Sequence, residues 1–128
     1  MRLVWLLDAE LPTPRINVDV RDRFGGFVCR PDLLDVESGT MGEYDGEGHR
    51  TRAQHRADEA RLDRARAVGL ERFTVVAGDS VETQVARMRA ARERALWLPA
   101  PQRAWVVAPS QGPALDEVLR ARDAPPAS

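Results

Sequence analysis

The chain has 128 residues, of which 43% are hydrophobic, and this length suits a single domain with one modest core. Its 19 basic and 20 acidic residues give a formal charge of −1, which excludes a strong overall attraction to nucleic acid and leaves local charge separation as the basis for binding it. Every basic residue is an arginine, so Schiff-base chemistry, a phosphate-loop lysine and a lysine beside a metal are excluded.

Cysteine content and hydropathy indicate a cytoplasmic protein. Cys29 is the single cysteine, so the chain has neither an internal disulfide nor a cysteine-based zinc site. The apolar run at residues 3–7 is followed by Asp8 and Glu10, which makes it too short for a membrane span or an export signal. We therefore expect a reducing compartment, the cytoplasm, and no membrane partner.

The N-terminal residues predict the end of a helix followed by a strand. The apolar residues before residue 9 predict helical turns that stop ahead of Pro12 and Pro14. Apolar and polar residues alternate over residues 16–21, which predicts a half-buried strand. Gly25-Gly26 then predicts a hairpin turn.

Two further strands complete a predicted meander. Residues 27–36 are strand-like, but Pro31 cannot donate to a ladder and implies a bend or bulge near Asp32. Residues 38–40 predict the following turn, and residues 41–45 predict the third strand.

Two helices flank a fourth strand in the second half of the chain. Residues 51–68 have a helical pattern that opens with the capping-box spacing of Thr51 and Gln54. Its apolar stripe is thin and consists of Ala53, Ala57, Ala60 and Val68. Residues 72–77 predict a strand, and a second helix is expected to begin at Asp79 as its cap.

Prolines change the character of the chain from Leu98 onward. Residues 105–107 predict a short strand and residues 114–122 a short helix, with a disordered end after them. We expect a domain over residues 1–97 and a proline-rich extension over residues 98–128. The order of elements predicts a mixed α/β sheet flanked by helices.

Three acidic residues carry the candidate chemistry. The turn places Asp32 within reach of the next strand, where Glu43 and Asp45 are two residues apart and therefore face the same side of the sheet. Carboxylates gathered at one sheet edge repel one another unless a divalent cation neutralises them, and oxygen ligands favour Mg²⁺ or Mn²⁺ over zinc. Such an ion would polarise a phosphodiester and activate water for hydrolysis.

The alternative is that these acids are ordinary solvated residues at turns and strand ends, as most Asp and Glu are. Acidic residues are disfavoured inside strands, so the run Glu43-Tyr44-Asp45 favours a site. Spacing alone leaves the two interpretations evenly balanced.

Two motifs suggest a family. They are Pro-Asp-Leu-Leu-Asp at residues 31–35 and Gly-Glu-Tyr-Asp-Gly at residues 42–46, followed by His49 and an arginine-rich helix. Together they resemble the PD-(D/E)xK, restriction-endonuclease-like superfamily, in its branch similar to very-short-patch-repair endonucleases, and within it an actinobacterial family of unknown function. The resemblance covers roughly residues 1–97 and implies an endonuclease-like domain with a restriction-endonuclease-like mixed β-sheet flanked by helices.

The resemblance also assigns roles to the acids. It implies that Asp32 and Glu43 bind the metal and that Asp45, which we take as a third ligand and catalytic residue, stands where the usual motif has lysine. Members of the family usually have a fuller first helix with a glutamate that completes the site. Met1 falls inside that helix and Glu10 lies too late to replace the glutamate, so we expect a member truncated at its N-terminus.

The entry to the arginine-rich helix supplies the remaining candidates. His49 directly follows the acidic strand and ranks first as the group that orients water or phosphate, although a helix-entry cap is an equally good interpretation. Arg50, Arg52, Gln54 and Arg56 would lie against the DNA backbone and give salt-sensitive, sequence-independent affinity. The second half of the helix is expected to be a solvated face of locally paired charges.

Two functions remain open at the level of sequence. The leading hypothesis is a metal-dependent endonuclease-like domain that hydrolyses DNA, with Mg²⁺ or Mn²⁺ bound by the three acids and His49 assisting. The rival is a catalytically degenerate nuclease fold that binds nucleic acid or protein, in a toxin–antitoxin or defence system. The motif order favours the first, and the absent lysine and first-helix glutamate favour the second.

Overall fold

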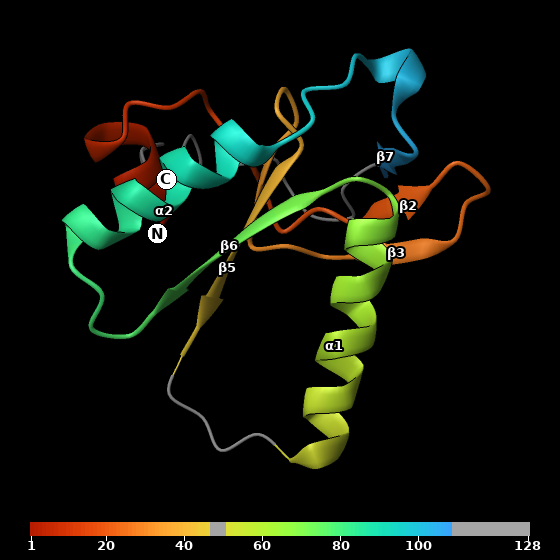
Figure 1. The fold of residues 1–128 in the computed structure, drawn as a ribbon, viewed down its shortest axis with the longest axis horizontal. Coiled ribbons are helices and arrows are strands. Elements are labelled where there is room, and N and C mark those ends of the chain that lie inside the picture. Colours follow the sequence, from red (N-terminus) through yellow and green to blue (C-terminus); the bar gives the residue numbers. More distant parts are fainter. Residues whose placement is uncertain (47–50, 109–128) are drawn as a thin grey trace, which may run out of the picture.

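The structure is a computed structural model that describes residues 1–46 and 51–108. Figure 1 shows its two long helices and its twisted strands. In chain order the elements are η1 (Val4–Asp8), β1 (Arg15–Ile16), β2 (Val20–Asp22), β3 (Phe27–Cys29), β4 (Leu33–Asp35), β5 (Thr40–Asp45), α1 (Arg52–Ala67), β6 (Glu71–Val76), α2 (Val81–Arg94), η2 (Ala100–Gln102) and β7 (Trp105–Val107). The helix predicted at residues 114–122 and the disordered end lie outside the described residues.

Two sheets organise the part of the chain that the structure describes. The larger has the order β1-β4-β5-β6, and the smaller has the order β3-β2-β7. β5 and β6 run parallel and are joined through α1, whereas the other pairs are antiparallel. η1 and α2 pack on one face of the larger sheet and α1 on the other. The predicted α/β class, with a mixed sheet and flanking helices, is confirmed.

The predicted meander is bent, so its strands contribute to both sheets. The strand expected over residues 16–21 divides into β1 and β2 after Asn17, whose φ of +50° is left-handed and tolerated by asparagine. The strand expected over residues 27–36 divides into β3 and β4 at Pro31. The Asn17 N–H donates to the Asp32 carbonyl at 3.3 Å, so both strands turn at one point and Asp32 lies there.

Each face of the larger sheet buries its own core. Neighbouring residues of β4 point to opposite faces, so Leu33 packs under η1 and α2, and Leu34 packs under α1 and the smaller sheet. In the first core Trp5 stacks on Phe73 with ring centroids 5.9 Å apart. Gly42 leaves room for that ring, because a Cβ atom there would lie 2.3 Å from it.

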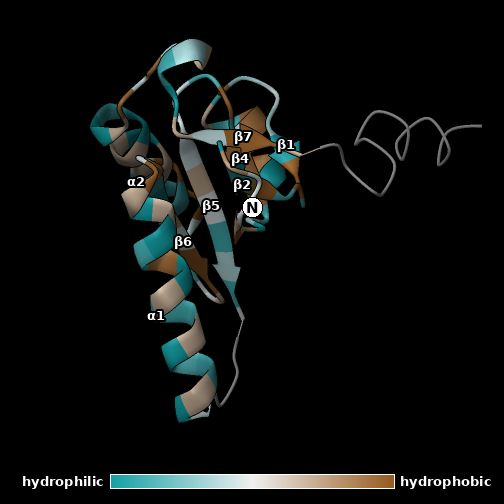
Figure 2. Cartoon of the chain, turned by 90° about the vertical axis from the view of Figure 1, so that its right-hand side faces the viewer, coloured by the Kyte–Doolittle hydropathy of each residue, from teal (hydrophilic) through white to brown (hydrophobic). Residues whose placement is uncertain are grey.

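α1 packs through its second half only. The capping box is confirmed, because the Gln54 N–H donates to the Thr51 hydroxyl at 3.1 Å and the Thr51 N–H donates to the Gln54 side chain at 2.8 Å. The predicted apolar stripe is wrong in its first half, where the alanines are exposed: Ala53, Ala57 and Ala60. Leu62 and Ala65 make the core contacts instead. Figure 2 shows the physical reason, since the first half of α1 projects past the ends of β5 and β6.

The N-cap of α2 lies one residue after the predicted cap, Asp79. Ser80 is the N-cap and accepts from the Thr83 N–H at 3.1 Å. Asp79 accepts from the Val76 N–H at 2.8 Å and pairs with Arg87, so it closes the end of β6 and does not cap the helix.

The strand predicted after the prolines is confirmed as β7. It pairs antiparallel with β2, with Trp105 opposite Asp22, and Trp105 is buried. Described residues beyond residue 97 thus complete the smaller sheet, while the division into a domain over residues 1–97 and an extension over residues 98–128 stays a prediction. None of the helices in the described ranges is long and apolar enough to cross a membrane.

A buried ion pair fastens α2 to the turn between β4 and β5. Asp35 accepts from the Ser38 hydroxyl at 2.5 Å and from Arg92 Nε at 2.9 Å, and its side chain is 3% exposed. Glu37 lies 3.7 Å from another nitrogen of the same guanidinium but is 63% exposed. Asp35, the last residue of the first motif, therefore has a structural role.

Asp35→Ala is expected to lower the free energy of unfolding by about 3 kcal/mol, because Arg92 and Ser38 lose their buried acceptor. Urea unfolding followed by circular dichroism measures the loss. Glu37→Ala is the matched control, since it removes an exposed carboxylate from the same arginine and should cost less than about 1 kcal/mol. Equal losses in the two variants would show that Asp35 is not the anchor.

The ionisation of Cys29 makes the free energy of unfolding depend on pH. Burial, and then the charge of Glu43, raise the pKa of the Cys29 thiol to about 11, against the opposing effect of Arg61 and Arg64. The unfolded thiol titrates near pH 8.5. The stability that the neutral thiol contributes is therefore fully present below that pH and is lost as the pH rises toward the folded pKa.

Above about pH 8.5, the free energy of unfolding of the wild type is expected to fall by up to roughly 1.4 kcal/mol per pH unit relative to Cys29→Ala. Denaturant unfolding at about pH 8, about pH 9 and about pH 10 measures the difference between the two proteins. Parallel pH profiles would contradict the raised pKa.

Candidate functional site

The predicted acids lie at the open end of the β4–β5 hairpin. The register pairs Leu33 with Gly42, and its continuation places Asp32 across from Glu43. Glu43 and Asp45 alternate with Tyr44 along β5, so both face the side of the sheet that carries α1. The structure thus brings Glu43 and Asp45 to one face, as the two-residue spacing predicts.

Asp32 is fixed by the backbone of β5. Its Oδ2 atom accepts from the Tyr44 N–H at 2.8 Å, and its own carbonyl accepts from the Asn17 N–H at 3.3 Å. The carboxyl group therefore reaches across the bend in the hairpin to the strand that carries Glu43 and Asp45. One of its oxygens is already occupied by this hydrogen bond.

Glu43 is ion-paired with α1. Arg61 Nη2 donates to Glu43 Oε2 at 2.8 Å, and Arg61 Nη1 lies 2.6 Å from Oε1. Arg72 Nη1 of β6 is 3.9 Å from Oε2. The Glu43 side chain is only 12% exposed, so a charge held there needs such a partner.

Both oxygens of Glu43 face Arg61. Oε1 is buried and lies 2.6 Å from Arg61 Nη1, although among the described residues no group forms a hydrogen bond with it. A contact this short between opposite charges still compensates the carboxylate. A ligand at Oε1 would therefore have to replace Arg61.

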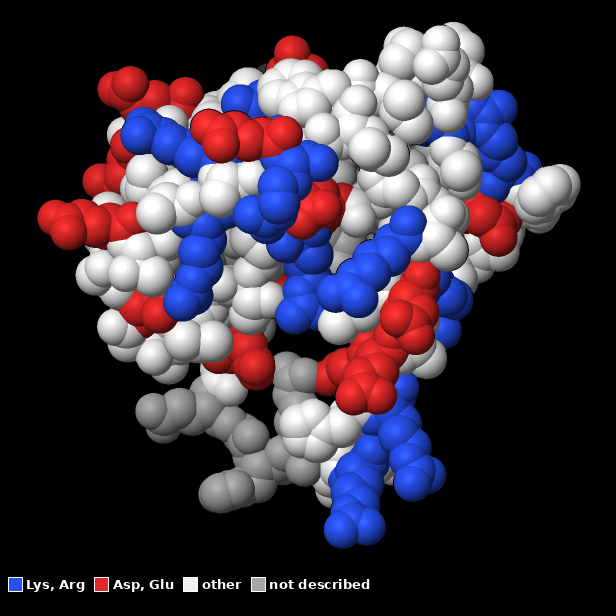
Figure 3. Space-filling model, in the orientation of Figure 1, with Lys and Arg blue, Asp and Glu red and all other residues white. Residues whose placement is uncertain are grey.

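A cavity of about 210 Å³ lies between β5, β6 and α1 beside this pair. We call it the β5–α1 cavity, and its lining consists of Glu43, Tyr44, Asp45, His55, Asp58, Glu59, Arg61, Leu62, Arg72 and Thr74. Figure 3 shows this side of the molecule, where arginine and acidic side chains are interspersed over α1 and the neighbouring strands. The cavity is thus polar and carries charges of both signs.

The oxygen donors present are of the kind that Mg²⁺ and Mn²⁺ prefer. Within residues 1–46 and 51–108, however, no three His, Cys, Asp or Glu side chains are grouped so that they could hold a metal ion. Metal binding through Glu43 would also require Arg61 to move from at least one carboxylate oxygen. The carboxylates are therefore of the right chemical kind to bind Mg²⁺ or Mn²⁺, but their side chains and Arg61 would have to move for a metal to bind.

Sequence reasoning missed the cations of the site. The second half of α1 was expected to be solvated, yet Arg61 there contacts Glu43. The spacing of Leu62, Ala65 and Val68 could have identified the buried face of α1, on which Arg61 also falls. His55, for which no role is predicted from the sequence, lines the same cavity.

The other predicted residues lie at the entry to α1. Arg52 and Arg56 are exposed, and the side chain of Gln54 is used in the capping box. His49 and Arg50 lie outside the described residues. The predicted contacts of these residues with DNA stay predictions.

The two motifs contain structural as well as candidate functional residues. Asp35 binds Arg92, and Gly42 makes room for Phe73, whereas Asp32 and Glu43 lie at the end of the hairpin. Comparison of the chain with family models, with curated proteins and with solved structures gives no match. The family resemblance thus rests on the motifs, and this structure adds where their residues lie.

Proposed function

We propose that the chain is a metal-dependent, endonuclease-like domain that hydrolyses phosphodiester bonds of DNA, with the restriction-endonuclease-like fold that its motifs imply. The observation that carries the proposal is the placement of Glu43 and Asp45 on one sheet face, across the hairpin from Asp32 and beside the polar β5–α1 cavity. These three residues would hold Mg²⁺ or Mn²⁺, which when bound supplies Lewis acidity and an activated water.

Arg61 has two roles in this proposal. Without metal, it compensates the charge of Glu43. When a metal takes over that compensation, the guanidinium is free to bind a phosphate oxygen, and arginine suits this because its planar fork matches phosphate. Arg72, 3.9 Å from the same carboxylate, is a second cation at the site. In this chain, which has no lysine, Arg61 and Arg72 are thus the cations beside the proposed metal site.

A second function is favoured by the same ion pair. Glu43 is already compensated by Arg61 and Arg72, so the fold is satisfied without any metal. The alternative is a catalytically degenerate module that binds nucleic acid or protein. The two functions differ in whether the purified chain binds a divalent ion.

Cleavage of plasmid and single-stranded DNA by the purified chain is expected to require Mg²⁺ or Mn²⁺ and to fall at least about 100-fold in Asp32→Asn and Glu43→Gln, because each change removes a ligand charge. Gel electrophoresis of timed reactions measures it. Arg66→Ala is the control on α1, since Arg66 is exposed and does not line the β5–α1 cavity.

Arg61→Ala separates the two functions. In the nuclease it should tighten Mn²⁺ binding, measured by isothermal titration calorimetry, while it slows cleavage, because Arg61 competes with the metal and assists the phosphate. If neither the wild type nor Arg61→Ala binds Mn²⁺ or cleaves DNA, the nuclease proposal fails and the binding module is favoured.

A further inference from the structure

The turn between β2 and β3 presents an aromatic ring to solvent. Phe24 is 98% exposed, the most exposed of the large hydrophobic side chains among the described residues. Phe27, at the start of β3, is 47% exposed and pairs with Arg21 in the register of β2 and β3. The turn and the start of β3 thus present two large apolar side chains, three residues apart in sequence, to solvent.

The turn that holds Phe24 is well ordered by hydrogen bonds. Asp22 Oδ1 accepts from the N–H groups of Phe24 and Gly26, both at 2.8 Å. Arg21 Nη1 donates to the Gly25 carbonyl at 3.1 Å, and Gly25 has a φ of +86°, which glycine adopts without strain. Phe24 is therefore held outward by its backbone and does not owe its exposure to a loose loop.

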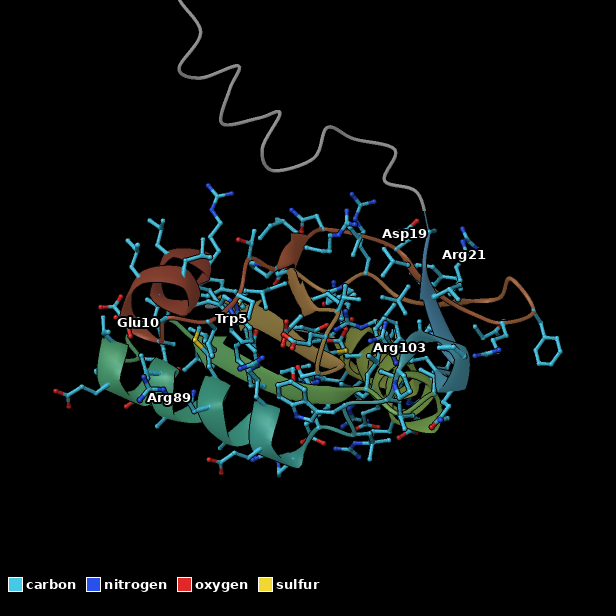
Figure 4. The ribbon with its side chains drawn as sticks, turned by 90° about the horizontal axis from the view of Figure 1, so that it is seen from above. Trp5, Glu10, Asp19, Arg21, Arg89 and Arg103 are labelled. Atoms are coloured by element: carbon cyan, nitrogen blue, oxygen red, sulfur yellow. The ribbon has the colours of Figure 1, made fainter. Side chains whose placement is uncertain are left out.

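The segment around η2 forms hydrogen bonds with the turn. The Arg23 guanidinium donates to the carbonyls of Ala100, Pro101 and Arg103, which lie in and after η2. Figure 4 shows Arg21 and Arg103 at the same end of the molecule, beside β7 and far from Trp5. We call Phe24 with Arg21, Arg23 and Arg103 the Phe24 tip.

The tip carries a net positive charge. Carbonyl oxygens accept from Arg21, Arg23 and Arg103 but leave each guanidinium with its full charge, and the Arg103 guanidinium also lies 4.9 Å from the centre of the Trp105 ring. Among residues 1–46 and 51–108, none of these three arginines forms an ion pair, in contrast to Arg61 and Arg92. Asp22 accepts from the backbone and likewise keeps its charge, whereas Asp19 pairs with Arg30 at 3.6 Å, so the arginines of the tip outnumber its carboxylates.

We propose that the Phe24 tip binds single-stranded nucleic acid, with the Phe24 ring stacked on an unpaired base and the arginines beside the phosphates. An exposed ring beside a net positive charge matches a ligand that has flat apolar faces and regular negative charge, and single strands offer both. The choice of nucleic acid as ligand rests on the proposed function, whereas binding itself can be measured without cleavage.

α1 connects the tip to the β5–α1 cavity. Arg64 of α1 donates to the Val28 carbonyl of β3 at 3.3 Å, and Arg61, one helical turn earlier, contacts Glu43. The strand that follows the turn with Phe24 and the strand that carries the acids therefore both contact the second half of α1.

Fluorescence anisotropy with a labelled oligothymidylate of about 12 nucleotides, within the usual site size of such proteins, tests the inference in EDTA. Phe24→Ala should raise the Kd at least about fivefold, because one stacked base is lost. Phe24→Trp should keep or lower the Kd. Because Phe24 is uncharged, Phe24→Ala should leave the salt dependence of the Kd unchanged, whereas Arg21→Gln should reduce it by about one phosphate contact.

Leu7→Ala is the matched control, because Leu7 is 71% exposed on η1 and should leave the Kd unchanged. Thermal unfolding of each variant checks that the fold is intact. Equal Kd values for the wild type and Phe24→Ala, or no binding by the wild type, would overturn the inference. Because the anisotropy measurement is made in EDTA and needs no cleavage, loss of binding in Phe24→Ala bears on the tip, whereas loss of cleavage in a variant that still binds bears on the nuclease.

Discussion

The contact between Glu43 and Arg61 is the interaction on which the rest of the candidate site depends. It joins the open end of β5 to the middle of α1 and holds a carboxylate that is only 12% exposed. Removing either charge would leave the other with a weaker partner at 3.9 Å, Arg72 for Glu43 and Asp58 for Arg61, in a poorly solvated place. The same contact orders the lining of the β5–α1 cavity and occupies an oxygen that a metal would need. Structure and proposed chemistry therefore compete for one carboxylate, and a divalent ion would have to replace the stabilisation that Arg61 now supplies.

Some residues of the two motifs stabilise the fold, and others are candidates for the proposed chemistry. Asp35 is buried against Arg92 and Ser38, and Gly42 is required because Phe73 fills the space of its missing side chain. Neither residue would be available to a substrate. Asp32 and Glu43 differ, since they lie where the hairpin bends and the strands stop pairing. A motif of this kind thus combines the residues that shape the hairpin with those that its shape brings together.

Much of the fold was predictable because its signals are local. The capping box at Thr51, the helix after it and the strand β7 follow from short sequence patterns and are present. The division of the meander was not predictable in detail, because it depends on a left-handed Asn17 bonded to Asp32. The shared face of Glu43 and Asp45 follows from strand periodicity, but the Arg61 contact spans 18 residues and depends on how α1 crosses the sheet. The pattern of charges along one helix does not predict where that helix crosses the sheet.

The bend in the hairpin links the two proposed surfaces. Because β1 and β4 remain in the larger sheet, their ends place Asp32 beside β5. Because β2 and β3 leave it for the smaller sheet, their turn points away from both cores and carries Phe24 into solvent. A straight hairpin would keep all these strands in one sheet. One local constraint at Asn17 and Pro31 thus separates the acidic residues of the hairpin from the aromatic, basic tip.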